Sequence, residues 1–182
     1  MSRLVAPDRG ALSAEALAIW DRIDASHGGA NRGPSRGPAA VIMNVPELAR
    51  RVFHTEDYFR TAAELPPVDR ELVILATVRE WDARYAWARH EARARQANVR
   101  PEAIEALRGQ GRLDGLTARE QTLAELVRTL LRTREVPEAL YQRAVDEVGP
   151  TQLVETIALI GSYCTIGLFI KTFEIPEDSP TF

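Results

Sequence analysis

Residues 71–91 read ELVILATVREWDARYAWARHE, and apolar side chains recur in this stretch every three or four residues. This period places apolar side chains on one face of an α-helix. The same period runs through nearly the whole chain, whereas no segment alternates apolar and polar residues in the way that is typical of a strand. The sequence therefore predicts an all-α protein.

Prolines, glycines and capping residues set the expected boundaries of the helices. Ser13 and Asp82 are residue types that cap helix N-termini, and Thr117 with Glu120 has the spacing of a capping box. Residues 27–38, HGGANRGPSRGP, hold four glycines and two prolines and are expected to form a loop. We expect helices over residues 13–25, 46–63, 67–80, 82–97, 101–107, 117–131, 137–147 and 151–173.

The composition indicates one soluble domain that covers residues 1–182. With 45% hydrophobic residues the chain can fill one sizeable core, and two separate domains of this total length would each be marginal. The net charge is −3, and the 23 basic and 26 acidic residues are spread along the sequence. Because no segment is strongly basic, we expect no nucleic-acid partner.

Cysteine content and hydropathy favour a cytoplasmic protein. Cys164 is the single cysteine, which excludes an intramolecular disulfide and any site that needs two thiols. The first eight residues lack the apolar core of a secretory signal. The longest uncharged run, residues 156–170, is interrupted by glycines and is shorter than the roughly 18 apolar residues of a membrane span. We therefore expect a buried helix there and no membrane partner.

Glu71 and His90 are the residues of the opening stretch that can transfer protons. Glu71 heads the apolar run Leu72 to Ala76, and burial raises the pKa of a carboxyl toward the range of a general acid or base. The alternative for Glu71 is a structural ion pair with an arginine such as Arg70 or Arg79.

His90 shares a helix face with small and aromatic residues, and imidazole is the natural proton shuttle near neutral pH. The alternative is a structural histidine bonded to a carboxylate such as Glu91 or Glu71. The three histidines, at positions 27, 54 and 90, do not have the helical spacing of a metal site, so no metal is expected.

Residues 65–99, LPPVDRELVILATVREWDARYAWARHEARARQANV, resemble the signature of the carboxymuconolactone decarboxylase family. The redox branch of this family includes the alkylhydroperoxidase D proteins. Residues 33–51, GPSRGPAAVIMNVPELARR, resemble the family's glycine- and proline-rich entry to the site, and residues 155–173, ETIALIGSYCTIGLFIKTF, resemble its closing helix. The resemblance covers most of the chain and implies a helical bundle of the carboxymuconolactone decarboxylase or alkylhydroperoxidase D-like type.

In the redox branch a glutamate, a CxxC pair and a histidine form a proton relay to the nucleophilic thiol. Glu71 and His90 match the glutamate and the histidine, and Tyr85 falls where a relay histidine lies between the two cysteines. The resemblance therefore implies Glu71, His90 and Tyr85 as catalytic residues. The cysteine positions hold Ala83 and Ala86, and an alanine methyl is neither a nucleophile nor an electron carrier.

The pattern Tyr85-x-Trp87-x-x-His90 is closer to the non-redox members, which include cofactor-free decarboxylases that act on a carboxylated lactone. In such a reaction His90 or Glu71 would supply the proton. Arg32 and Arg36 in the loop would hold the substrate carboxylate through paired hydrogen bonds, or would simply be solvated. Trp87 would wall an apolar substrate pocket, together with Trp81, or belong to the core.

We therefore expect a cofactor-free, decarboxylase-like lyase that acts on a small carboxylated or lactone-like metabolite by proton transfer. The alternatives are a family member that binds a ligand without turnover and, less favoured, a hydroperoxide reductase. The helix over residues 151–173 carries apolar residues on more than one face, which predicts a homo-oligomer. The resemblance implies a trimer or hexamer.

Overall fold

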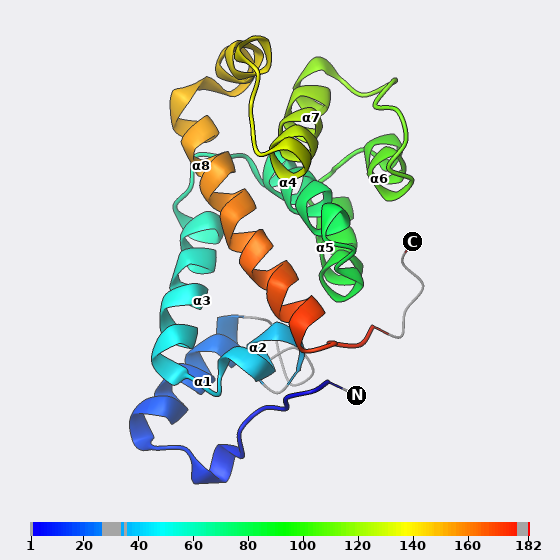
Figure 1. The fold of residues 1–182 in the computed structure, drawn as a ribbon. Coiled ribbons are helices and arrows are strands. Elements are labelled where there is room, and N and C mark those ends of the chain that lie inside the picture. Colours follow the sequence, from blue (N-terminus) through cyan, green and yellow to red (C-terminus); the bar gives the residue numbers. More distant parts are fainter. Residues whose placement is uncertain (1, 27–33, 35, 178–181) are drawn as a thin grey trace.

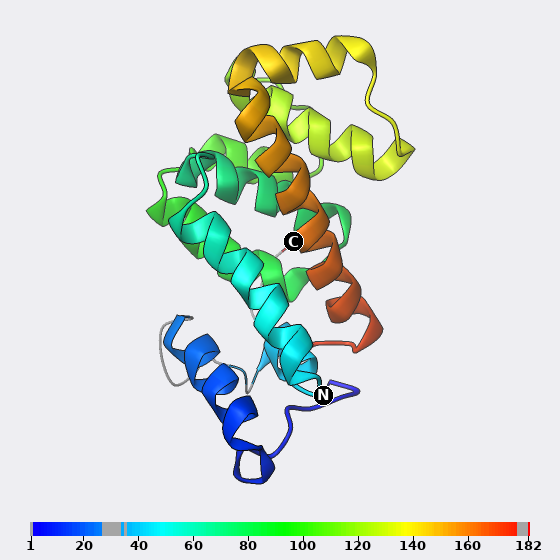
Figure 2. The ribbon, with the colours of Figure 1, turned by 90° about the vertical axis from the view of Figure 1, so that its left-hand side faces the viewer.

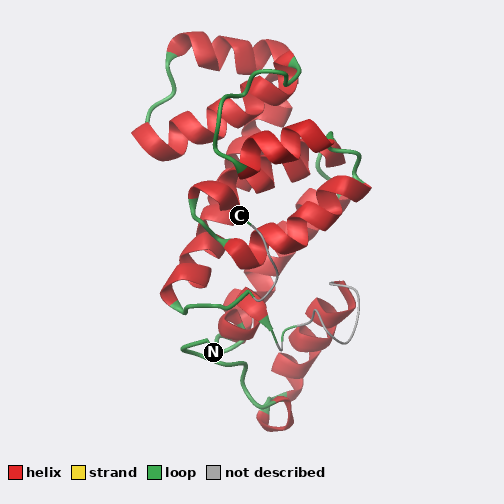
Figure 3. Cartoon of the chain, turned by 90° about the vertical axis from the view of Figure 1, so that its right-hand side faces the viewer, coloured by secondary structure: helices red, strands yellow, loops and turns green. Residues whose placement is uncertain are grey.

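The computed structural model describes residues 2–26, 34, 36–177 and 182 (Figure 1). Within these ranges the chain forms helices and no strand, which Figure 3 shows by secondary structure. This confirms the all-α fold. A short 3-10 helix, Arg9–Ala11, precedes α1 (Ala14–Ser26), α2 (Gly37–Ile42), α3 (Pro46–Thr61), α4 (Pro67–Glu80), α5 (Arg84–Gln96), α6 (Pro101–Arg108), α7 (Ala118–Thr133) and α8 (Glu138–Thr172).

Most helix starts follow from residues that the sequence makes visible. α3, α4 and α6 each have a proline in their first turn, where the missing N–H costs no hydrogen bond. The backbone N–H of Ala16 donates to Ser13 Oγ at 3.2 Å, as expected of a cap. Both halves of the Thr117–Glu120 capping box are present at the start of α7.

Two expected boundaries were wrong. Asp82 is not the N-cap of α5, because its φ is 47° and Ala83 occupies the cap position. The Asp82 carboxylate instead accepts a hydrogen bond from Lys171 Nζ of α8 at 2.8 Å. The expected loop over residues 27–38 ends two residues early, since Gly37 begins α2 with Pro38 in its first turn.

The two helices expected over 137–147 and 151–173 occur as the two arms of α8. Gly149 has φ 76° and ψ 165°, outside the helical region, and Pro150 follows it. Glycine adopts a positive φ without steric cost, and proline cannot continue the hydrogen-bonding ladder. Figure 2 shows the resulting change of direction between the arms of α8.

The core forms where α4 packs against α5, α7 and α8. Almost every residue of α4 from Glu71 to Val78 is buried. The second arm of α8 is buried on one face, whereas Val154 and Leu168 on the other are 70% and 51% exposed. α8 is long and apolar enough to cross a membrane by length and composition, but half of its most apolar window is buried within the protein. This burial is typical of a core helix.

Candidate active site

Glu71 and His90 form a buried pair at the interface of α4 and α5. Trp81 to Ala83 connect the two helices, and Glu71 lies ten positions before this link and His90 seven positions after it. Glu71 Oε2 lies 2.8 Å from His90 Nδ1, and the two residues are 3% and 6% exposed. The contact of His90 with Glu71, which the sequence offered as one alternative for this histidine, is therefore present in the structure.

Glu71 is ionised despite its burial. Desolvation opposes the charged form, but the hydrogen bond from His90 and the charges of His90, Arg70 and Arg93 outweigh it and lower the pKa of Glu71. Arg70 Nε lies 3.3 Å from Glu71 Oε1. The expectation of a raised pKa is thus wrong, because it assumed a carboxyl without a cationic partner. Arg79, the other candidate partner, donates to the backbone oxygen of Arg108.

Tyr163 of α8 completes a line of three side chains. Its hydroxyl lies 3.1 Å from His90 Nε2, and the two rings meet edge to face with centroids 5.0 Å apart. Burial, and then the charges of Glu56 and Glu71, raise the pKa of Tyr163 well above its ordinary value. Sequence reasoning missed this residue. The available signal was a phenol inside the buried apolar run 156–170, where a hydroxyl needs a polar partner.

Two cavities meet at this line. The first, of about 90 Å³, extends toward α2 and Tyr85, and the second, of about 280 Å³, extends toward Arg70 and Ile74. Both are concave sites with apolar and charged side chains, the usual composition of a small-molecule site. The residues that line both cavities, here called the shared wall, are Glu56, His90, Arg93 and Tyr163.

Arg93 is the cation of the shared wall. Its side chain is half-buried, and its guanidinium has no hydrogen bond or ion pair within the described part of the chain. Most other arginines at the cavities are already engaged. Arg89, for example, pairs with Glu177 and stacks on the Tyr85 ring at 3.5 Å. Arg93 is therefore available to an anion that enters either cavity.

Residues 46–129 match the model of the carboxymuconolactone decarboxylase family. The matched segment holds Glu71, Tyr85 and His90, whereas Arg36 and Tyr163 lie outside it. A search of curated proteins gives no match to the chain.

The resemblance places the redox cysteines of the family at Ala83 and Ala86, and neither residue has a thiol. Ala86 lines the first cavity, and Ala83 is fully buried. Cys164 is partly buried, less than the sequence suggested, and lies in the lining of neither cavity. No cluster of three His, Cys, Asp or Glu side chains that could hold a metal ion occurs among the described residues.

Tyr85 lines the first cavity but stands apart from the Glu71–His90 pair. No hydrogen bond joins it to either residue in the described ranges. Its ring lies against Gly37, where an added Cβ would come within 2.3 Å of the Tyr85 hydroxyl oxygen. Gly37 also has φ +65°, so this residue of α2 must be glycine for two independent reasons.

Among the expected carboxylate-binding arginines, Arg36 lines the first cavity with an exposed side chain. Arg32 lies outside the described residues. The structure thus places one of the two loop arginines at the site and adds Arg93, which sequence reasoning missed because its helix carries arginines on several faces.

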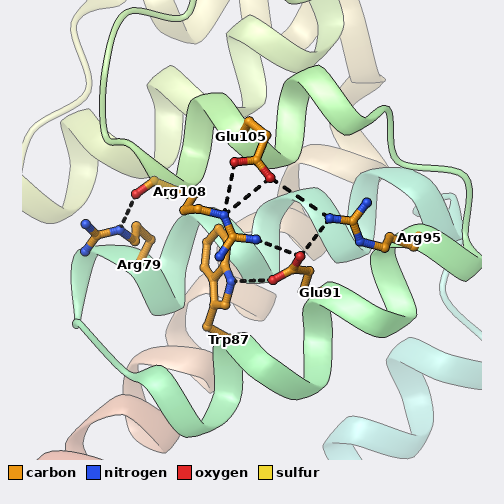
Figure 4. A network of polar contacts seen from close by, with 6 residues as sticks. All are labelled: Arg79, Trp87, Glu91, Arg95, Glu105 and Arg108. Atoms are coloured by element: carbon orange, nitrogen blue, oxygen red, sulfur yellow. Dashed lines mark hydrogen bonds and ion pairs between the residues drawn. The ribbon is translucent and has the colours of Figure 1, made fainter. Parts of the chain in front are cut away.

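Trp87 lies away from both cavities. It is fully buried, and its Nε1 donates to Glu91 Oε2 at 2.9 Å (Figure 4). Arg95 and Arg108 bind the other oxygen of Glu91 at 2.8 and 2.6 Å. Trp87 therefore belongs to the core, which was the alternative to a place in the wall of the substrate pocket. Trp81 packs against Gly167 of α8 and lines neither cavity.

Proposed function

We propose that this chain is a cofactor-free, decarboxylase-like lyase that acts by proton transfer on a small carboxylated or lactone-like metabolite. The observation that carries the proposal is the buried Glu71–His90 pair, whose imidazole lies in the wall shared by two cavities. The match of residues 46–129 to the model of the carboxymuconolactone decarboxylase family supports this class of activity.

Glu71 has the charge that the partner of a proton-transferring histidine needs. The ionised Glu71 accepts the Nδ1 proton of His90, which orients the ring and stabilises the imidazolium form. Loss of a carboxylate from the substrate breaks a C–C bond, releases carbon dioxide and leaves the bonding electron pair on carbon, delocalised into a conjugated carbonyl. A proton from the enzyme then forms the new C–H bond, and solvent restores the proton to the enzyme.

Arg93 and Arg36 would bind the substrate anion. A guanidinium holds a carboxylate through two parallel hydrogen bonds, and both side chains lack an ion pair within the described ranges. Arg93 faces the cavities next to His90, whereas Arg36 lies at the side of the first cavity formed by α2. A carboxylate on Arg93 would therefore lie close to the proton-transferring group.

The test is a screen of the purified protein against small carboxylated lactones and β-keto acids, with carbon dioxide and substrate consumption both measured. We expect carbon dioxide release from at least one compound and its loss in Arg93→Gln. The matched control is Arg134→Gln, which changes an exposed arginine at the end of α7. Saturable binding without consumption of any compound would instead identify a ligand-binding protein without turnover.

A further inference from the structure

We propose that Tyr163 is the residue that exchanges the proton with the substrate. His90 passes a proton to and from Tyr163, and Glu71 orients His90. This inference rests on the proposed proton-transfer function and names a catalytic residue outside the segment that matches the family. It assigns to α8 a chemical role that the sequence pattern of α4 and α5 alone does not suggest.

The first argument is that both nitrogens of His90 already have partners. Nδ1 is 2.8 Å from Glu71 Oε2, and Nε2 is 3.1 Å from the Tyr163 hydroxyl. A substrate that took its proton directly from His90 would have to displace one of them. The Tyr163 hydroxyl, in contrast, has one O–H and two lone pairs, so it can bind His90 and a substrate at the same time, and Tyr163 lines both cavities.

The second argument is that the direction of each hydrogen bond is fixed by chemistry. An ionised carboxylate only accepts, so the proton between Glu71 and His90 belongs to Nδ1. In the neutral imidazole Nε2 is then an acceptor, and the Tyr163 hydroxyl is the donor. In the imidazolium form, which the charge of Glu71 stabilises, Nε2 donates to the Tyr163 oxygen instead, so the Tyr163 O–H proton is free for a substrate.

The proton balance closes in both directions. As an acid, Tyr163 gives its O–H proton to the substrate carbon that holds the electron pair, while the Nε2 proton of a His90 imidazolium passes to the Tyr163 oxygen. As a base, Tyr163 takes a substrate proton on oxygen while its own proton passes to Nε2. No free phenolate forms in either direction, which agrees with the raised pKa of this buried phenol.

The charged groups around Tyr163 favour this relay. Glu56 of α3 and Glu71 of α4 oppose a tyrosinate, whereas Arg70 of α4 and Arg93 of α5 act in the opposite sense. Tyr85, the other phenol of the first cavity, lies against Gly37 and has no hydrogen bond to His90 in the described part of the protein.

The decisive variant is Tyr163→Phe, which keeps the ring and removes the hydroxyl. With the substrate found in the screen, we expect kcat to fall by about 10²-fold or more while KM changes by less than about threefold. The control is Tyr141→Phe, an exposed tyrosine in the first arm of α8. Wild-type kcat in Tyr163→Phe would overturn the proposal.

A measurement without substrate separates this inference from the proposed function. We expect ¹⁵N NMR of the wild-type protein to show His90 as the Nδ1–H tautomer wherever the ring is neutral, with an Nε2 resonance that shifts in Tyr163→Phe and not in Tyr141→Phe. An Nε2–H tautomer in the wild type would overturn the role of Tyr163 even if the protein proves to be a lyase. A failed activity screen with the expected tautomer would instead reject the lyase and leave the relay in place.

Discussion

Glu71 is a buried carboxyl that stays charged, and this determines what it can contribute. A carboxyl with a lowered pKa is a poor proton donor near neutrality, so Glu71 acts as the fixed anion that orients and stabilises His90. The sequence was sufficient to select both residues, because Glu71 heads an apolar run and His90 shares a helix face with small and aromatic residues. The sign of the pKa shift could not be predicted, since it depends on the 2.8 Å contact with a residue on another helix.

Replacement of either member of the pair should lower turnover. We expect Glu71→Gln and His90→Gln each to reduce kcat by roughly 10²- to 10⁴-fold, the usual effect of a positioned acid or base. The double variant should be scarcely slower than either single one, because residues that act as a unit are not additive. His54→Gln, at an exposed histidine, is the control. Steady-state kinetics and melting temperature together decide whether the pair is catalytic or only structural.

Glu71 should also affect how the free energy of unfolding depends on pH in the acid range. Because its folded pKa lies below the unfolded value of about 4.3, it stabilises the folded state above pH 4.3 and loses this contribution as the pH falls through the folded pKa. We expect the free energy of unfolding of Glu71→Gln to depend less on pH below about 4.3 than that of the wild type. Urea titrations between pH 3 and 7 measure this, with the exposed Glu135→Gln as control.

At the scale of elements, the site depends on how α2 and α8 approach the α4–α5 pair. Prolines and the capping box predicted the starts of α3, α4, α6 and α7, because these signals act within one turn. Asp82 was misassigned as a cap because it has a positive φ in the link between α4 and α5, and no local sequence pattern indicated this conformation. Tyr163 was missed because its partner His90 is 73 positions away in the sequence.

The contact of α2 with α5 can be tested at Gly37. We expect Gly37→Ala to lower the free energy of unfolding by more than the roughly 1 kcal/mol of backbone strain at a positive φ, because its Cβ also meets the Tyr85 ring. In a Tyr85→Ala background the same change should cost only the strain. Denaturant unfolding of the four proteins gives the coupling, and Gly111→Ala, where a Cβ would meet nothing, should be nearly neutral. Equal costs in both backgrounds would contradict the clash.

At the scale of the whole molecule, the outer face of α8 exposes apolar side chains. Val154, Ile157 and Leu168 lie on this helix at helical spacing and are 70%, 41% and 51% exposed. Apolar side chains in a continuous exposed row usually mark an interaction surface. The expected homo-oligomer remains a proposal, and this row is the surface through which we propose that copies associate.

Sedimentation at micromolar concentration tests this association. We expect the wild type to sediment as an oligomer and Leu168→Glu to sediment as a smaller species with an unchanged circular dichroism spectrum, because a buried unpaired charge opposes association. Val5→Glu changes an exposed apolar residue far from α8 in sequence and should leave the wild-type distribution unaltered. A monomeric wild type would reject the proposal.

The second arm of α8 carries Tyr163 on its inner face and the exposed apolar row on its outer face. A rigid helix transmits displacement from one face to the other, so a neighbouring copy that packs on the outer row would also hold the phenol in its place beside His90. Specific activity would then depend on protein concentration. Dilution would lower the specific activity at protein concentrations at which each chain is still folded.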